Sequence, residues 1–505
     1  MKKQTLRIIR AGSTVLLSLM AFQFLGVAKQ TMANKNVIKV KPAELTQEKK
    51  TAMQWIDDQK KLLGSLSDRI WKFAELSLQE FKSSALLADA LRDSGFEVTS
   101  GISNMPTAFV AEYGTGKPVI GILAEYDALP GLSQKAVSRP DPLQEGGSGH
   151  GCGHNVFGAA CVGAAMAVKY TMERAGIEGI IRLYGCPAEE NYSGKTYMAR
   201  DGWFDDLDAA LHWHPSTTNR VSLSSNNALN GVEIEFFGKS AHAAGSPWSG
   251  RSALDAVELL NIAMNYLREH VALTSRIHYV ITQGGSAANI VPDHAKVWYM
   301  VRDKDRQGVK YLTERLYECA QGASLMTRTT YQISILEGSW NMLINEEGSK
   351  IMYSNLLLVG PPRFTEEEQE FARAIQREMK IEEKGLSTVI EHLKQPEAPR
   401  GSGSSDVSDV SWITPTIGLN VALWPLGAPG HHWSVVACGG VSIAQKTLAA
   451  AAKTLACTAM DLFTKPALLE RLWTEWKEKT KGIPYKSAIP EGQKPPQFKK
   501  PVSDN

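Results

Sequence analysis

The sequence predicts an α/β fold in which a small second domain interrupts a larger one. Three apolar, strand-like segments between residues 118 and 215 alternate with helical patterns, as is typical of a largely parallel sheet. Residues 229–340 then follow the order strand, helix, strand, strand, helix, strand, which is the βαββαβ pattern of a ferredoxin-like domain. Because α/β patterns resume after residue 340, we expect the βαββαβ domain to be an insertion.

The chain divides into five segments on this basis. They are a targeting segment at 1–33, the first part of the larger domain at 45–228, the insertion at 229–340, the second part of the larger domain at 341–465, and a C-terminal tail at 466–505. We expect the Pro- and Lys-rich end of the tail, from residue 483 onward, to be extended.

Residues 1–33 differ in kind from the rest of the chain. Four basic residues (Lys2, Lys3, Arg7 and Arg10) precede an uncharged, largely apolar run that ends near Ala28. This order is typical of a secretory signal, with cleavage after Ala28 or Ala33. The run is about 18 residues long, near the minimum for a membrane-spanning helix, so an uncleaved anchor is the alternative. We expect export to the periplasm.

The composition and charge of the chain argue against a nucleic-acid partner. The chain has 505 residues, of which 43% are hydrophobic and 21% charged, enough for two or three domains with substantial cores. Its formal net charge is +2, and no long basic run is interleaved with aromatic residues, so we expect no nucleic-acid partner. The six cysteines are widely scattered, unlike those of a disulfide-dense small domain, and no pairing can be assigned.

Polar side chains follow each of the three strand-like segments. Glu125 and Asp127 follow the first, Glu189 and Glu190 the second, and His214 ends the third. The carboxyl ends of strands in an open α/β sheet converge on the ligand-binding crevice. We therefore expect these groups to meet at one site.

A cysteine and several histidines join this set. Seven of the eleven histidines lie in four short segments beside glycine or proline: His150, His154, His212, His214, His242, His431 and His432. Cys152 precedes His154 and a helical segment whose N-terminus would favour a thiolate.

Thiolate, imidazole and carboxylate together suit zinc, with manganese or cobalt as alternatives. One acid of the Glu189–Glu190 pair can then bind the cation, while the other acts as general base toward a water. A nucleophilic Cys152 with His154 as its base is the competing interpretation, although it leaves the acidic pair unexplained.

Seven stretches together resemble the M20 metallopeptidase family, in its amidohydrolase branch, and most closely the p-aminobenzoyl-glutamate utilisation B-subunit type. They are "AEYDALPGLSQ", "GHGCGHN", "CPAEENYSGKTYMARDGWFDDLDAALHWHP", "FFGKSAHAAGSPWSGRSALDAVE", "GGSAANIVPD", "DVSDVSW" and "APGHHW". The resemblance implies an M20-type catalytic domain that holds two divalent metal ions, zinc or manganese. It also implies that the inserted domain is a lid that serves in dimerisation.

The resemblance assigns roles to individual residues. In this family a cysteine bridges the two ions, and Cys152 stands at that position. The other implied metal ligands are His154, Glu190, His214 and His431, with His212 and His432 as alternatives to the last two. Glu189 would be the general base and acid, and Asp127 would orient a metal ligand from behind it.

In the lid, His242 resembles the histidine that polarises the scissile carbonyl, and Asn289 a residue that contacts the substrate, often across a dimer. Arg251 and Lys239 are candidates for binding a substrate carboxylate, although both could equally be surface charges. Two departures leave the metal stoichiometry open: Glu125 stands where many M20 enzymes have histidine, and Asn155 where many relatives in this branch have aspartate.

The function expected from the resemblance is hydrolysis of the amide bond of an N-acyl or aroyl amino acid such as p-aminobenzoyl-glutamate. The alternatives are an N-acyl amino acid or dipeptide hydrolase of other specificity, and a metal-binding partner subunit without activity of its own. We expect a homodimer, or a hetero-oligomer with a related subunit.

Overall fold

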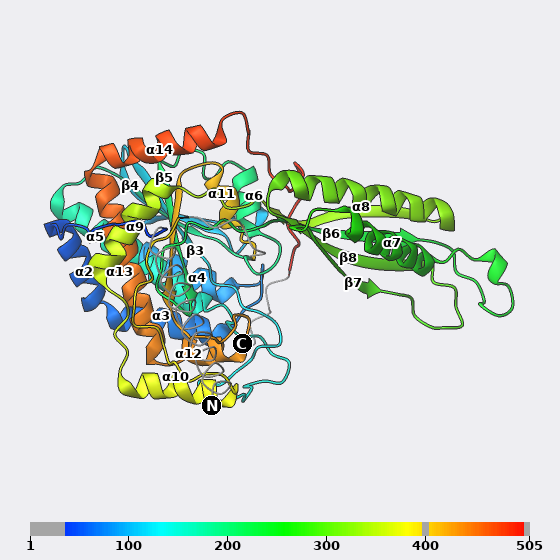
Figure 1. Cartoon of the computed structure of the whole chain (residues 1–505), viewed down its shortest axis with the longest axis horizontal. Coiled ribbons are helices and arrows are strands. Elements are labelled where there is room, and N and C mark those ends of the chain that lie inside the picture. Colours follow the sequence, from blue (N-terminus) through cyan, green and yellow to red (C-terminus); the bar gives the residue numbers. More distant parts are fainter. Residues whose placement is uncertain (1–35, 396–402, 499–505) are drawn as a thin grey trace, which may run out of the picture.

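The computed structural model describes residues 36–395 and 403–498, which form two lobes. The larger lobe, here called the body, contains a six-stranded sheet, and the smaller lobe, the lid, projects from it as an elongated arm (Figure 1). This arrangement confirms the predicted α/β fold with an inserted domain. The predicted export signal at residues 1–33 lies outside the described residues.

The body sheet has the strand order β1-β2-β4-β3-β5-β10. Strands β3, β4, β5 and β10 are parallel to one another, whereas β1 and β2 join them in antiparallel fashion. The strands are β1 (Glu97–Ser100), β2 (Phe109–Thr115), β3 (Val119–Ala124), β4 (Gly179–Gly185), β5 (Ala209–Ser216) and β10 (Thr416–Ala422). Every residue of β3 is buried, as expected for a strand covered on both faces.

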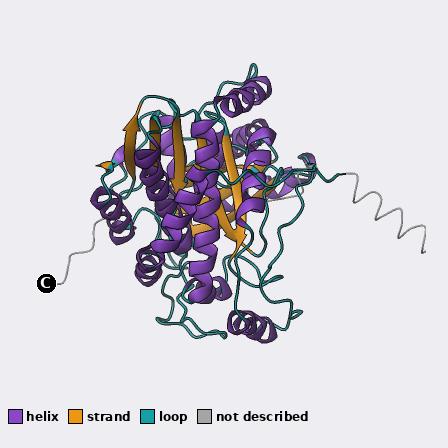
Figure 2. Cartoon of the chain, turned by 90° about the vertical axis from the view of Figure 1, so that its left-hand side faces the viewer, coloured by secondary structure: helices purple, strands orange, loops and turns teal. Residues whose placement is uncertain are grey.

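Helices cover both faces of the body sheet. On one face α5 (His154–Ala175) and α13 (Ser442–Thr464) pack on the strands, with α2 (Gln47–Asp58) and α3 (Lys60–Phe73) against them (Figure 2). Small residues of α5 allow these helices to approach closely, because a side chain at Gly163 would collide with Leu63. The remaining body helices are α4 (Phe81–Asp93), α6 (Gly194–Arg200), α9 (Glu346–Val359), α10 (Glu366–Glu378), α11 (Val407–Ser411), α12 (Trp433–Gly439) and α14 (Pro466–Thr480).

The lid has the predicted βαββαβ order and its own apolar core. Its antiparallel sheet has the order β7-β8-β6-β9, so β7 and β9 are its edges. The elements in chain order are β6 (Ala228–Phe237), α7 (Ala253–Leu267), β7 (Arg276–Gln283), β8 (His294–Asp303), α8 (Arg306–Thr327) and β9 (Thr330–Ser339). Both helices pack against the sheet (Figure 1).

The segment expected to be a C-terminal tail is in part a helix of the body. Leu472 of α14 is fully buried, and the indoles of Trp473 and Trp476 donate hydrogen bonds to the backbone carbonyls of Asp208 (3.0 Å) and Ser411 (2.8 Å). Most charged residues of this helix are exposed, whereas Glu475 is half-buried and accepts from the backbone N–H groups of Glu346 (2.7 Å) and Glu347 (2.9 Å). The chain beyond α14 contains no helix or strand as far as residue 498, in agreement with the predicted extended end.

Within the described ranges, no single helix is long and apolar enough to cross a membrane. The bent pair α12 and α13 meets the length and composition only when the two are joined, and α13 belongs to the buried core.

Candidate metal centre

The candidate site lies where β3, β4 and β5 end. Glu125 and Asp127 follow β3, Glu189 and Glu190 follow β4, and His214 lies two residues before the end of β5. The structure thus brings together the side chains that the sequence placed at the carboxyl ends of three strands.

The loop after β4 has an unusual backbone. Ala188, Tyr192 and Ser193 have φ angles of 62°, 75° and 55°, in the left-handed region that residues other than glycine seldom adopt. Two buried carboxylates hold this loop: Glu80 accepts from the Ala188 N–H, and Asp127 accepts from the Glu190 N–H, both at 2.9 Å. Such strain is typical of functional sites, where surrounding contacts impose it.

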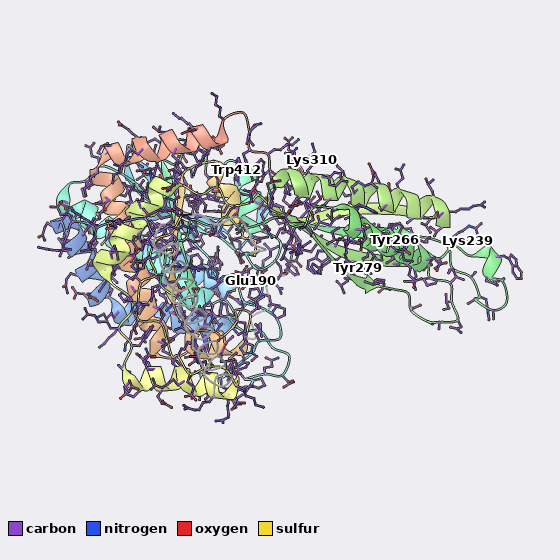
Figure 3. All side chains as sticks on the ribbon, viewed as in Figure 1. Glu190, Lys239, Tyr266, Tyr279, Lys310 and Trp412 are labelled. Atoms are coloured by element: carbon purple, nitrogen blue, oxygen red, sulfur yellow. The ribbon has the colours of Figure 1, made fainter. Side chains whose placement is uncertain are left out.

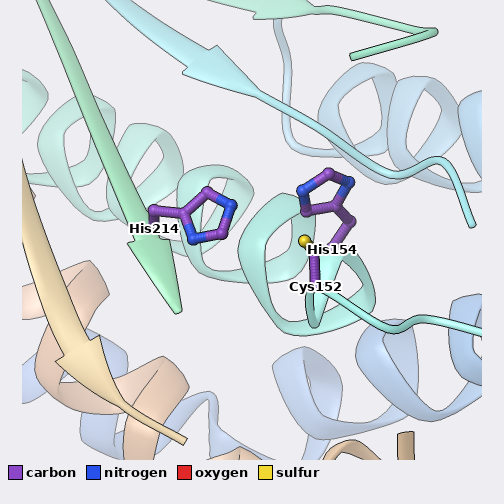
Figure 4. A group of neighbouring side chains, drawn as sticks. All are labelled: Cys152, His154 and His214. Carbon is purple, nitrogen blue, oxygen red and sulfur yellow. The ribbon is translucent and has the colours of Figure 1, made fainter. Parts of the chain in front are cut away.

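Cys152 and His154 lie at the start of α5. Gly153, between them, caps the helix with a φ of 77°, a conformation that glycine adopts without strain. The potential ligand atoms of Cys152, His154 and His214 all lie within 4.8 Å of one another. In Figure 4 the sulfur of Cys152 lies between the two imidazole rings.

A second group shares Cys152. The potential ligand atoms of Cys152, Glu190 and His431 also lie within 4.8 Å of one another, and Nε2 of His431 is 3.3 Å from Glu190 Oε2. His431 comes from the loop before α12 and is tied to the cysteine loop, because its N–H donates to the carbonyl of Gly151 (2.9 Å). Its side chain is 61% exposed, so this group lies at the open side of the centre.

Hydrogen bonds at Nδ1 leave the Nε2 atoms of two histidines free for a metal. Nδ1 of His154 is 2.9 Å from Asp127 Oδ1, and Nδ1 of His214 is 2.7 Å from the carbonyl of Pro215. Buried Nε2 of His154 and Oε1 of Glu190 have no hydrogen-bond partner among the described residues. Orphaned buried atoms of this kind are rare, and bound cations would satisfy them. The donor set therefore fits a divalent metal.

The electrostatics of the site also favour a cation. Burial and the neighbouring carboxylates Glu125 and Glu190 raise the pKa of Glu189 well above its usual value. Burial, Glu190 and Glu189 likewise raise the pKa of Cys152. The thiolate expected from the helix N-terminus is thus disfavoured unless a cation binds, which argues against Cys152 as a free nucleophile.

The pKa of His154 moves the other way. Burial alone would lower it, but the carboxylates of Asp127, Glu125 and Glu190 together outweigh burial and raise the pKa to about 10. The ring therefore lies in a strongly anionic setting, where a bound metal ion would replace the proton on Nε2.

The two alternative histidines lie outside both groups. His212 is on the same face of β5 as His214, but its ring packs over Gly418, where a Cβ atom would lie 2.1 Å from Nε2. His432 caps α12, with Nδ1 at 2.9 Å from the hydroxyl of Ser434. The geometry thus favours His214 and His431 as ligands.

The structure does not bring the lid residues to the site within one chain. Lys239 pairs with Arg251 through backbone hydrogen bonds (2.8 Å), and Ala243 N–H donates to the carbonyl of Asn289 (3.1 Å). His242 therefore belongs to one cluster with these residues. Figure 3 shows Lys239 at the end of the lid that is remote from Glu190.

The predicted lid residues differ in what they can offer a ligand. His242 is exposed, and its Nδ1 accepts from the N–H groups of Ala244 (3.2 Å) and Gly245 (3.0 Å), so the Nε2 atom is its proton donor. Asn289 is also exposed. The guanidinium of Arg251 donates to the carbonyl of Trp248 (3.3 Å), so that it already has a structural partner.

Three buried charged residues around the site were not predicted from the sequence. Glu80 supports the loop after β4, while Lys195 and Asp406 form an ion pair beside Glu125. They lie far apart along the chain and carry no spacing signal. "DVSDVSW" offered a partial clue, because it contains Asp406.

Comparisons with known proteins agree with this geometry. Residues 225–324 match the sequence model of the peptidase dimerisation domain of the M20 family. The chain is 39% identical over 460 residues to the B subunit of p-aminobenzoyl-glutamate hydrolase from Escherichia coli (strain K12), covering 86% of this chain and 96% of that protein. It is 29% identical over 449 residues to Xaa-Arg dipeptidase of Mus musculus, covering 86% and 93%.

Solved structures share the fold at low sequence identity. An aminobenzoyl-glutamate utilization protein from Klebsiella pneumoniae superposes with a TM-score of 0.56 at 17% identity, covering 79% of this chain and 97% of that one. A dinuclear metal binding peptidase of the M20 family from Bacillus subtilis gives 0.52 at 17% identity, covering 81% and 99%. This chain belongs to the M20 family of peptidases and amidohydrolases, and it is a hydrolase.

Proposed function

We propose that this hydrolase is a two-metal enzyme that cleaves the amide bond of an N-acyl or aroyl amino acid such as p-aminobenzoyl-glutamate. The observation that carries the proposal is that Cys152 belongs to two groups of potential metal ligands at once. The name of the relative from Escherichia coli supports the choice of substrate.

The two ions would share the Cys152 thiolate. His154 and His214 would hold one ion, and Glu190 and His431 the other. Zinc suits this mixture of sulfur, nitrogen and oxygen donors, and manganese is the alternative. When bound, the ions would polarise the scissile carbonyl and make water more acidic.

Glu189 is suited to move protons at this centre. Its carboxylate lies within 4.8 Å of the ligand atoms of His154 and Glu125, and neither group that shares Cys152 includes it. It would accept a proton from the attacking water and then donate that proton to the leaving amine.

Asp127 supports the centre from behind. One oxygen holds Nδ1 of His154, and the other accepts from Ser77 Oγ and from the Glu190 N–H, each at 2.9 Å. One carboxylate thus orients two metal ligands. Hydrogen bonds of this kind fix the tautomer and direction of a ligand before the ion binds.

A second copy of the chain would supply the residues that one chain lacks. Strand β7 is an edge of the lid sheet, and apolar side chains beside it are exposed: Ile262 (48%) and Tyr266 (72%) on α7, and Val280 (52%) on β7. This surface belongs to the segment that matches the peptidase dimerisation domain. We propose a homodimer through β7 and α7, in which His242 of each lid reaches the body of its partner.

In that dimer His242 would donate a hydrogen bond from Nε2 to the carbonyl oxygen as negative charge develops there. Asn289 would contact the substrate in the same dimer, and Arg251 and Lys239, which lie in the same cluster, are candidates to bind its carboxylate. A hetero-oligomer with a related chain is the alternative, since the relative from Escherichia coli is itself named as one subunit of its hydrolase.

Export to the periplasm is proposed from the basic and apolar pattern of residues 1–33 alone. Fractionation of cells that produce the full chain tests it. The protein is expected in the periplasmic fraction with its N-terminus at residue 29 or 34, and an intact N-terminus in the membrane fraction would favour the anchor.

The main experiment compares wild type with Glu189→Gln, both purified from residue 34 onward. Metal content and turnover would be measured with p-aminobenzoyl-glutamate, a panel of N-acyl amino acids, and Xaa-Arg dipeptides. We expect two ions per chain in both proteins and a loss of turnover on the order of 10²- to 10⁴-fold in the variant.

Equal turnover by the two proteins would remove Glu189 from the mechanism. Turnover that survives chelators and stops on thiol alkylation would favour a Cys152 nucleophile. Bound metal without turnover on any substrate would favour a partner subunit that is inactive alone.

A further inference from the structure

A buried lysine stands directly behind the candidate metal centre. Nζ of Lys195 lies 2.7 Å from Glu125 Oε1 and 2.7 Å from Asp406 Oδ1, and all three side chains are at most 1% exposed. Asp406 also accepts from the backbone N–H of Lys195 (2.8 Å). The ammonium is therefore fixed by two carboxylates that come from distant parts of the chain.

Such a network is not explained by stability. Removing charges from water is costly, and apolar residues of similar volume often stabilise a fold as well as a buried ion pair does. Here the two carboxylates outnumber the single ammonium, so the three groups carry a net negative charge at the floor of the centre. A role in positioning is the better explanation.

Glu125 connects this network to the centre. Its second oxygen, Oε2, lies 3.3 Å from Nε2 of His154 and has no hydrogen-bond partner among the described residues. Glu125, His154 and Glu189 form a third group whose potential ligand atoms lie within 4.8 Å of one another. The free oxygen of Glu125 thus faces the nitrogen that would hold an ion.

We propose that Lys195 and Asp406 are positioning residues that hold Glu125 with Oε2 directed at the ion bound by His154, and that Glu125 adds a donor to this ion. The inference rests on the proposed function and deepens it, because it makes the two ion sites unequal. Lys195 occupies Oε1, so that Glu125 presents a single oxygen to the centre.

The second ion has different surroundings. Of its expected ligands, Glu190 is buried, with a side chain that is 3% exposed, whereas the side chain of His431 is 61% exposed at the open side of the centre. The buried ion at His154 and His214, with an added carboxylate oxygen, is therefore the tighter of the two. Stepwise loss of metal, with the His431 ion leaving first, follows from this asymmetry.

The test measures Zn²⁺ affinity directly, by competition with a chromophoric chelator, in the full-length chain. The variants are Glu125→Gln, which keeps the shape of the side chain, and Lys195→Met, which removes the cation. We expect both to weaken the tighter ion on the order of 10- to 100-fold. The affinity for the weaker ion should fall by less, because Glu125 is not among its expected ligands and the two ions are coupled only through the shared Cys152.

Lys49→Met is the matched control. Lys49 is another buried lysine of the body, paired with Asp461 at 2.6 Å between α2 and α13, away from the centre. Breaking this pair should lower the thermal midpoint and leave both zinc affinities unchanged. The control thus separates a loss of stability from a loss of metal binding.

Three outcomes would overturn the inference. If Glu125→Gln binds both ions as tightly as wild type does, Glu125 is not a donor, even when the proposed function holds. If Lys195→Met lowers only the thermal midpoint, as Lys49→Met does, its role is structural. If wild type binds no zinc at all, the proposed function fails together with this inference.

Discussion

The predicted site has two parts, the metal centre in the body and the residues around His242 in the lid. The first part is buried, and the second is exposed. In the body, Asp127 and His154 are fully buried and hydrogen-bonded to each other before any ligand binds. In the lid, His242 and Asn289 are exposed, and Trp248 of the same loop is 77% exposed. The body can therefore bind ions by itself, whereas the lid residues can act only where another surface meets them.

This difference predicts different effects for substitutions in the body and in the lid. A change in the body should alter metal content, proton transfer or both, without altering assembly. A change in the lid should alter turnover or assembly and leave the ions in place. Three variants test this division, from the largest expected effect to the smallest.

Cys152→Ala should cause the largest loss, because Cys152 is common to both groups of ligands. We expect the metal content to fall from two ions per chain toward none, and turnover to disappear with it. Cys161→Ala is the control, since Cys161 is a buried free cysteine of α5, near Cys152, and its thiol faces the carbonyl of Leu123. Retention of both ions by the Cys152 variant would contradict a bridging role.

His242→Ala should leave the metal content unchanged and lower turnover on the order of 10²- to 10³-fold, as the loss of one donor to a developing oxyanion does. His270→Ala removes another exposed lid histidine and should have no effect. Steady-state kinetics and metal analysis on the same samples check both statements. If the removal of His242 changes the metal content, His242 is itself close enough to the ions to bind one, which contradicts the division between body and lid.

The double change Ile262→Glu and Tyr266→Glu puts two charges on the exposed face of α7. Light scattering should show a shift from dimer to monomer, because burying these charges opposes association. Part of the variant should still dimerise at assay concentration, so turnover should fall less than in His242→Ala and should rise with protein concentration as more dimers form. A stable dimer in this variant would place the interface elsewhere.

The fold was largely predictable because hydrophobic periodicity identifies its strands and helices. Continuous apolar runs marked the buried parallel strands, and the alternation of strands and helices in residues 229–340 marked the lid. The error came at α14, whose many charged residues outweighed the apolar spacing of Leu472, Trp473 and Trp476. A helix with a single buried stripe depends on tertiary contacts that composition does not reveal.

The candidate site was predictable where polar residues follow a strand closely, as with Glu189 and Glu190, or lie at short spacing, as with Cys152 and His154. The choice between neighbouring histidines needed coordinates, because His212 and His214 lie on the same face of β5 and only the structure shows that His214 meets Cys152 and His154. Lys195 and Asp406 are 211 residues apart in the sequence, and only packing makes them neighbours. No local pattern encodes such a pair.

Complementation between two inactive chains tests the central claim, that a complete site takes its body from one chain and its lid from another. Glu189→Gln and His242→Ala chains would be co-expressed, isolated as mixed dimers through different tags, and assayed. In each mixed dimer one of the two sites would join an intact body to an intact partner lid, so activity should recover to about half of wild type. If the mixed dimers form and stay as inactive as either parent, each lid serves its own body or none, and the account of a shared site is contradicted.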